Sequence, residues 1–408
     1  MKKYLLQLFK TPMLLVFLII CLIFAIPAVG QTAEINRYSI DTVLGIDFDD
    51  ETDEVLVSLL TFTPVAEQTF TENYKVVTSK GRSVSEALDF VGLNIGREIG
   101  LSHTKLVVLN KGLLDKDVSL YLDYLARNKF LGSETRLVVA ESSTKEVLEA
   151  VQKLDSESSI KLSEVLSFNE DYIYASEASF QSFFKGMFGP TKVSLVPMIS
   201  LRGENEGLEV SGEATGSEGS NTDTKEVVKE IENKGKTVVF KDGKLNTILE
   251  GLDIKKINLI NGNFSTGSVV LEHFSDENFD DAKLTFEILD KDIRSKVIFQ
   301  NNVPIILMNG NCTVSLSEVQ TKDGVVKKNV EFTGISNSVK NALEIKFKEL
   351  ISQGIEIMRD HKIDVIDFYT LMSNSNHKAF EKFLSTLEDQ DDYLNSIVFK
   401  IGANIFTR

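Results

Sequence analysis

The stretch that decides the fold runs from residue 40 to residue 62 and reads IDTVLGIDFDDETDEVLVSLLTF. Apolar residues fill its two ends, and six acidic residues crowd its centre between Asp47 and Glu54. Two apolar runs bounded by a polar turn predict a pair of antiparallel strands. The acidic centre lacks the glycine and the ligand spacing of a calcium-binding EF-hand loop. We therefore expect a β-hairpin with a solvated tip.

The next element along the chain is a helix that starts after Ser83. Ser83 and Glu86 have the spacing of a capping box. Apolar residues follow at three- and four-residue intervals, namely Ala87, Leu88, Val91, Ile95 and Ile99. Gly92, Gly96 and Gly100 recur at every fourth residue, so we expect one stripe of this helix to pack closely against a sheet.

His103 stands between this helix and a strand expected at residues 105–109. One interpretation makes it a contact or ligand residue at the helix-to-strand junction. The other is more common for polar side chains in such places, and has the imidazole hydrogen-bonding to backbone groups of the junction.

Helices and strands then alternate as far as residue 155. The pattern predicts a helix at residues 120–128, a strand at 135–140 and a second helix from Ser143 or Thr144. A cluster of large apolar residues follows before Pro190, namely Phe180, Phe183, Phe184, Met187 and Phe188. Such clusters more often form a core or a domain contact than a ligand site.

Residues 203–236 are rich in Gly, Ser, Glu, Thr and Asn and predict a flexible linker or an exposed loop. They separate an N-terminal α/β region at residues 34–202 from a C-terminal α+β domain at residues 237–408. The C-terminal domain is expected to begin with a strand at 238–241 and a turn at Asp242-Gly243. Its further expected elements are strands at 269–273, 283–289, 296–300, 304–309 and 312–316, a long helix from Val339, helices at 365–371 and 378–387, and a closing strand. We therefore expect a multi-domain α+β fold with mixed β-sheets packed against helices.

The N-terminus has the features of an export signal. Three lysines precede an apolar run from Met13 to Val29, and Ala28 and Gly30 fit a signal-peptidase site before Gln31. Residues 1–30 are thus a signal peptide or, if retained, an N-terminal membrane anchor. At about 1.5 Å per residue the run covers roughly 25 Å, against a hydrocarbon core of about 30 Å. Either way, we expect the remaining chain outside the cytoplasm.

The two cysteines are Cys21 and Cys312, and their positions argue against an internal disulfide. Lipidation at Cys21 is disfavoured, because Ile20 precedes it and the chain stays apolar after it.

The composition excludes several classes of function. The 408 residues include 60 acidic and 44 basic side chains, for a net charge of −16, and no concentrated basic patch offsets the repulsion of a phosphate backbone. Nucleic acid is therefore not an expected partner. The four histidines, His103, His273, His361 and His377, stand alone, so we expect neither a metal site nor another cofactor. Nucleotide-binding glycine motifs and a nucleophile elbow are also missing from the sequence, which favours a binding or assembly protein over an enzyme.

Ten segments, taken in order, resemble one known family. They are Glu34-Ile35, Val43-Leu44-Gly45-Ile46-Asp47, Ser85-Glu86-Ala87-Leu88, Gly96-Arg97-Glu98, Leu101-Ser102-His103-Thr104-Lys105, Tyr121-Leu122-Asp123-Tyr124-Leu125-Ala126-Arg127, Leu195-Val196-Pro197, Val238-Val239-Phe240-Lys241-Asp242-Gly243-Lys244-Leu245, the helix from Val339, and Ile363-Asp364-Val365-Ile366-Asp367-Phe368. The chain resembles the Ger(x)C-type spore germination proteins, the C subunits of the nutrient germinant receptors of endospore-forming bacteria. The order and spacing of the segments carry the resemblance, which spans the exported part.

The resemblance implies three small mixed α/β domains on the outer face of the spore inner membrane. It also implies assembly with a multi-pass A subunit and a transporter-like B subunit, and no catalytic residues. The family normally carries a lipidated cysteine ahead of its opening motif, whereas this chain reads Ala28-Val29-Gly30-Gln31. With Gln31 at that position, membrane attachment would need a retained apolar N-terminus or the partner subunits.

Two other functions stay open on the residues alone. One is a freely exported solute-binding protein, and the other is a hydrolase that uses a pair of carboxylates, although the sequence singles out no such pair.

Overall fold

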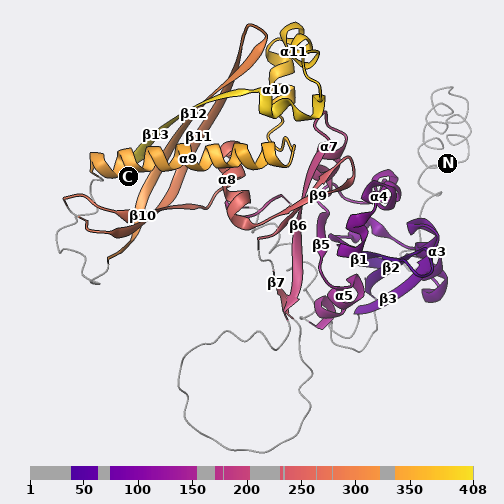
Figure 1. The fold of residues 1–408 in the computed structure, drawn as a ribbon. Helices are drawn as coiled ribbons and strands as arrows, with labels where there is room; N and C mark the ends of the chain where they lie inside the picture. The colour runs from indigo at the N-terminus through magenta and orange to yellow at the C-terminus, as the bar shows by residue number, and fades with distance from the viewer. Residues whose placement is uncertain are drawn as a thin grey trace, which may run out of the picture.

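A computed structural model shows two mixed β-sheets joined side by side (Figure 1). It describes residues 38–62, 74–153, 171–177, 179–202, 230–232, 235–262, 264–277, 279–321 and 336–407. Helices cover both sheets, so the expected α+β class with mixed sheets packed against helices is confirmed.

The first sheet has nine strands. They are β1 (Ile40–Asp49), β2 (Glu54–Phe62), β3 (Tyr74–Gly81), β4 (Leu106–Asn110), β5 (Arg136–Ala140), β6 (Val193–Arg202), β7 (Glu230–Glu232), β8 (Thr237–Lys241) and β9 (Lys244–Leu249). Their order is β3-β2-β1-β4-β5-β6-β8-β9, with β7 also on β6. The β1-β4-β5-β6 pairings are parallel and the others antiparallel. The predicted hairpin of β1 and β2 is confirmed, and its tip is solvated.

In the part of the chain that is described, four helices cover this sheet on its two faces. Helices α3 (Val84–Ile95), α4 (Val118–Arg127) and α7 (Phe180–Met187) bury apolar residues on one face, and α5 (Thr144–Lys153) covers the other. The aromatic cluster of α7 lies largely in the core, as expected, but Phe188 is exposed. Two short 3₁₀ helices, η3 (Leu101–His103) and η4 (Lys111–Asp115), flank β4.

The predicted glycine stripe on α3 is wrong, because the helix ends at Ile95. Gly96 adopts a φ of +67° and closes the helix as its C-cap. Gly100 lies beyond the helix, where a Cβ atom would come within 2.6 Å of the Ser39 carbonyl oxygen. Three glycines at equal spacing therefore have separate roles. The cap at Ser83 is confirmed, since its hydroxyl accepts from the Glu86 amide.

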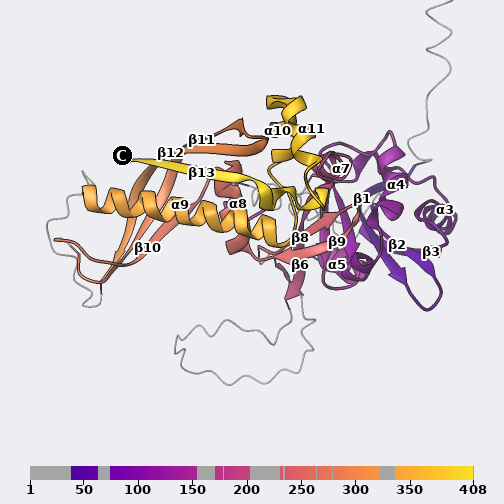
Figure 2. The same cartoon turned by 45° about the horizontal axis from the view of Figure 1, so that its top comes forward.

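The second sheet has the order β10-β11-β12-β13. Its strands are β10 (Ser268–Phe274), β11 (Ala282–Gln300), β12 (Val303–Gln320) and β13 (Val398–Thr407). The helices of this half are α8 (Gly251–Asn261), α9 (Asn337–Asp360), α10 (Phe368–Ser375), α11 (His377–Leu384) and the 3₁₀ helix η5 (Gln390–Ser396). The long helix α9 crosses one face of the sheet, and Figure 2 shows it running alongside β13. Residues Leu343, Phe347 and Ile351 of α9 lie in the core beneath.

Four predicted strands of this half are in fact two. The segments at 283–289 and 296–300 form the single strand β11, and those at 304–309 and 312–316 form β12. The residues between the predicted segments include Asp290 and Asn311, which are of types common in turns. They instead lie within strands that pair along nearly their whole length, with a register shift between Ile288 and Asp290.

The first sheet continues across the predicted linker. Within residues 203–236, Glu230–Glu232 form β7 on β6, while 203–229 and 233–234 lie outside the described residues. Strands β8 and β9 follow the linker in sequence, yet β8 pairs with β6. Because side chains alternate along a strand, Phe240 enters the core of the first sheet and Val239 that of the second. Strand β8 therefore joins the two halves.

Candidate functional site: the junction of the two sheets

The β8–β9 hairpin brings polar side chains of the first sheet to the second half. Its turn, Asp242-Gly243, has φ values of 52° and 74°, the left-handed values that a two-residue hairpin loop needs. The predicted strand at 238–241 and the predicted turn after it are thus confirmed. The ammonium group of Lys192 holds the turn from outside, 2.8 Å from the Asp242 carboxylate.

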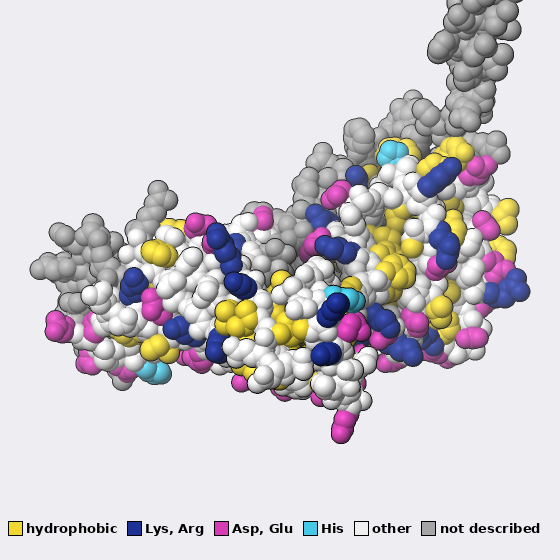
Figure 3. All heavy atoms as spheres, turned by 90° about the horizontal axis from the view of Figure 1, so that it is seen from above, with side chains coloured by type: hydrophobic (Ala, Val, Ile, Leu, Met, Phe, Trp, Pro, Cys, Tyr) yellow, Lys and Arg dark blue, Asp and Glu magenta, His cyan; other side chains and the backbone are white. Residues whose placement is uncertain are grey.

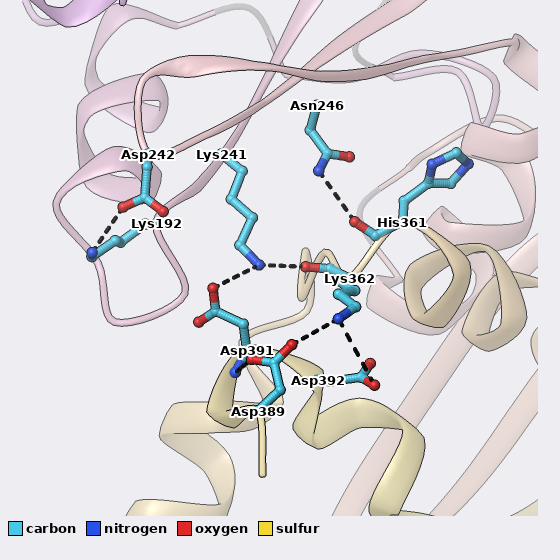
Figure 4. A network of polar contacts seen from close by, with 9 residues as sticks. All are labelled: Lys192, Lys241, Asp242, Asn246, His361, Lys362, Asp389, Asp391 and Asp392. Carbon is cyan, nitrogen blue, oxygen red and sulfur yellow. Dashed lines mark hydrogen bonds and ion pairs between the residues drawn. The ribbon is translucent and has the colours of Figure 1, made fainter. Parts of the chain in front are cut away.

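The hairpin reaches the C-terminal end of α9 (Figure 4). The Lys241 ammonium donates to the Lys362 carbonyl oxygen at 2.9 Å, and the Asn246 amide donates to the His361 carbonyl oxygen at 3.2 Å. The last carbonyl groups of a helix lack partners within the helix and attract positive charge. His361 is the C-cap of α9 and Lys362 follows it, so Lys241 and Asn246 hold the C-terminal end of α9 from another sheet.

Helix η5 and its N-cap residue, Asp389, contribute three carboxylates to the same network. The Lys362 ammonium lies 2.7 Å from Asp389 and 4.0 Å from Asp392, while Lys241 lies 3.6 Å from Asp391. The Asp389 hydrogen bond raises the pKa of Lys362, and Lys362 in turn lowers the pKa of Asp389. Since exposed ion pairs add little stability, the network orients the elements rather than holding the fold together. Figure 3 shows basic and acidic side chains interspersed over the face seen from above.

A buried carboxylate lies near this network. Asp364, 4% exposed, accepts from the amides of Phe368 and Tyr369 and from the Tyr393 hydroxyl at 2.5 Å. Burial raises the pKa of Asp364 above its ordinary value, although these hydrogen bonds oppose the shift. Burial also raises the pKa of Tyr393. The Asp364 side chain thereby ties η5 to the start of α10, which begins at Phe368 rather than at the predicted residue 365.

A cleft of about 700 Å³ opens at the same junction. Its walls come from both halves and include Glu177, Lys185, Asn261, Asp364 and Asp367. Among the described residues, no group of three or more potential metal ligands lies together. Lys241, Asp364 and Asp367 hold backbone groups and helix ends at the junction, which is the chemistry of a structural joint.

His103 lies elsewhere, at the exposed end of η3. The backbone contact that one interpretation assigned to it is made by Thr104, which is buried and donates its hydroxyl to the Asp41 carbonyl oxygen at 3.1 Å. That His103 contacts a partner stays a prediction. The other histidines lie apart from it in the fold, at β10, at the end of α9 and at the start of α11.

One structural contact of the opening motif was missed from the sequence. Asp47 is 7% exposed and accepts from the Thr144 backbone amide at 3.1 Å and from the Thr144 hydroxyl, at the start of α5. Burial raises the pKa of Asp47, opposed by these two bonds. Gly45 lies beside Thr144, with room for no side chain. The sequence did predict a helix start at Ser143 or Thr144. No local sequence pattern, however, pairs Thr144 with Asp47, which lies 97 positions away.

The membrane-attachment predictions concern residues 1–30, Cys21 and Gln31, which lie outside the described residues. Within the described part of the chain, no helix has the length and apolar character needed to cross a bilayer.

Comparison with known proteins places both halves in one family. Residues 31–201 match the family described as "Spore germination protein N-terminal domain", and residues 235–403 match "Spore germination B3/GerAC like, C-terminal". Spore germination protein KC of Bacillus subtilis (strain 168) is 22% identical over 347 residues, which cover 82% of this chain and 78% of the relative. The crystal structure of the GerBC protein is similar with a TM-score of 0.51 at 14% identity. This match covers 89% of this chain and 96% of that one, and it shows the fold alone. The chain therefore belongs to the Ger(x)C family of spore germination proteins, the C subunits of germinant receptors.

Proposed function

We propose that this chain is the extracytoplasmic C subunit of a spore nutrient germinant receptor, which assembles with a multi-pass A subunit and a transporter-like B subunit. The observation that carries the proposal is the match of two germination-family models, in order, to the two halves of the chain. The proposed location is the outer face of the spore inner membrane.

The geometry of the junction supports a role in assembly. Lys241, Asn246 and Asp364 use their polar groups to fix backbone and helix ends. A joint of this kind gives two sheets one defined arrangement, which a receptor subunit needs in order to present surfaces to its neighbours. We propose no catalytic role.

The mode of attachment is a separate part of the proposal. Gln31 stands where the family carries a lipidated cysteine, so the apolar run at 13–29 would serve as a retained anchor, or the partner subunits would hold the chain. N-terminal sequencing of the protein from spore membranes checks this. A first residue of Gln31 would exclude the anchor and leave attachment through partners.

Deletion of the gene tests the function. We expect normal growth and normal spore counts, but loss of the germination response to at least one nutrient, restored by the wild-type gene. Normal germination with every nutrient would overturn the proposal. Saturable binding of a solute to the purified chain in calorimetry, together with normal germination, would instead support the exported solute-binding protein.

A further inference from the structure

The second sheet ends in a strand, β13, whose outer edge pairs with no other strand that the structure describes. Strand β13 pairs in parallel with β12 over all its ten residues, from Val398 opposite Ile305 to Thr407 opposite Val314. In the described part of the chain, no strand pairs with the other edge of β13. Figure 2 shows β13 at the margin of the sheet, next to α9.

The direction of one amide shows which groups face this edge. The Ile405 amide lies 3.5 Å from a carboxylate oxygen of Glu344 on α9, so it points away from β12. In a strand, the N–H and C=O of one residue point to the same edge, and successive residues alternate. The backbone amides of Phe399, Ile401 and Ala403 therefore also point away from β12. Among the described residues, these three amides have no hydrogen-bond acceptor.

The opposite side of the same sheet is protected differently. Strand β10 pairs with β11 only between Ala282 and Glu287, and the outer half of β11 carries five charged residues: Asp290, Lys291, Asp292, Arg294 and Lys296. Charges at an edge discourage pairing with another chain. Strand β13 has one charged residue, Lys400, and exposes Val398 and Phe406 at 44% and 53%. It lacks the protection that β11 has.

The rim beside β13 is basic, although the whole chain has a net charge of −16. The Lys340 ammonium lies 5.8 Å from the centre of the Phe406 ring, and Arg359 donates to the Leu394 and Ile397 carbonyl oxygens just before the strand. Lys348 is on the same stripe of α9 as Lys340 and Glu344, at intervals of four residues. Among the described residues, the cations assigned to this rim are Lys340, Lys348, Arg359 and Lys400, and the carboxylate that contacts the backbone of β13 is Glu344.

We infer that the open edge of β13 accepts an extended segment of a partner subunit as a fifth strand. The residues of that segment that lie along β13 would be uncharged, and its acidic side chains would face the basic rim. Main-chain hydrogen bonds would supply the affinity, and the charges of the rim would supply the specificity. A second copy of this chain fits less well, because pairing two β13 strands would bring two basic rims together. The inference rests on the proposed assembly with partner subunits.

Hydrogen exchange at single amides tests the inference. The full chain is measured alone and in the receptor complex purified from membranes. We expect the Phe399, Ile401 and Ala403 amides to exchange rapidly in the isolated chain, and at least about tenfold more slowly in the complex. The Lys400 and Gly402 amides face β12 and should be protected in both. Equal exchange of the three outward amides in the two samples would overturn the inference.

Two charge reversals provide a matched pair. Lys400 and Lys296 both lie opposite Leu307, on the two sides of β12, and both are exposed. We expect Lys400→Glu to lower recovery of the partner subunits with this chain at least about tenfold, and Lys296→Glu to leave it unchanged. Equal loss in both variants would contradict the assignment of the edge.

A backbone variant addresses the hydrogen bonds directly. Ile401→Pro removes an outward N–H without removing a bond to β12, and should also lower recovery of the partners. Its unfolding midpoint shows whether it folds, and the Lys400→Glu result stands if it does not. Protection of the outward amides in a dimer of the isolated chain would overturn the choice of partner. Failure of any A or B subunit to co-purify overturns the proposed function itself, whereas co-purification with unprotected amides overturns only this inference.

Discussion

Replacing Gly45 with alanine should destabilise the first sheet through its contact with α5. A Cβ atom at Gly45 would lie 2.4 Å from Thr144 Oγ1 and 2.5 Å from Thr144 Cβ, far inside the usual contact distance of about 3.5 to 4.0 Å. Thr144 has little freedom to retreat, because its amide and its hydroxyl both donate to the buried carboxylate of Asp47.

The cost has two parts. Forcing a methyl group into a packed core costs about 1 to 3 kcal/mol. Displacing Thr144 also weakens hydrogen bonds to a carboxylate, each of which contributes about 1.5 to 3 kcal/mol. Because the displacement is partial, we expect Gly45→Ala to lower the free energy of unfolding by about 2 to 4 kcal/mol.

Urea unfolding followed by far-ultraviolet circular dichroism measures this loss, since the chain has no tryptophan for fluorescence. A double-mutant cycle with Thr144→Gly isolates the clash, because that change removes the two atoms closest to the new methyl group and leaves only Leu148 Cδ1, at 3.4 Å. In the Thr144→Gly background, Gly45→Ala should cost less than about 1 kcal/mol.

Gly132→Ala is the matched control, since a Cβ atom there meets only Thr135 Oγ1 at an ordinary 3.7 Å. It should change stability by less than about 0.5 kcal/mol. An equal cost of Gly45→Ala in both backgrounds would refute the reasoning, because the clash with Thr144 would then not be the cause.

Three further predictions concern the junction. Tyr393→Phe removes a donor to the buried Asp364 and should cost about 1.5 to 3 kcal/mol in urea unfolding, and a loss below about 0.5 kcal/mol would contradict the role given to this bond. Because the pKa of Asp364 is raised by burial, the stability that its protonation adds is present at low pH and is lost as pH rises above 3.8. The stability gap between the wild type and Asp364→Asn should therefore narrow from pH 3.5 to pH 7, and a widening gap would show that the pKa is lowered instead. Lys241→Met should change global stability by less than about 1 kcal/mol, yet speed amide exchange at residues 360–364. Unchanged exchange there would mean that β8 does not hold the end of α9.

Local patterns predicted the elements whose determinants lie close together in sequence. The hairpin around Asp49, the cap at Ser83 and the turn at Asp242-Gly243 each depend on neighbouring residues, and the structure confirms all three. The glycine stripe failed for a related reason. Equal spacing from Gly92 to Gly100 implied a continuing helix, but a left-handed residue at Gly96 ends it.

Two long strands were each predicted as two short ones, because polar residues in the middle of a strand resemble a turn in sequence. Asp290 and Asn311 are of types common in turns, but here they lie within β11 and β12, on the solvated side of a sheet. Only the pairing of β12 with β11 and β13 shows that these strands are continuous. The candidate site could not be predicted from local patterns either, because the Lys241 ammonium donates to the carbonyl oxygen of Lys362, 121 residues away in sequence.

The sequence by itself determined the class of fold, the family and the local elements, because periodicity, caps and turn residues act over a few positions. The tertiary structure decided that β8 joins two cores, that Asp47 holds the start of α5, and that one edge of β13 has no paired strand among the described residues. These features depend on backbone groups and carboxylates that find partners, or lack them, across long separations. Hydrogen bonding and close packing between distant segments arise only once the chain has folded.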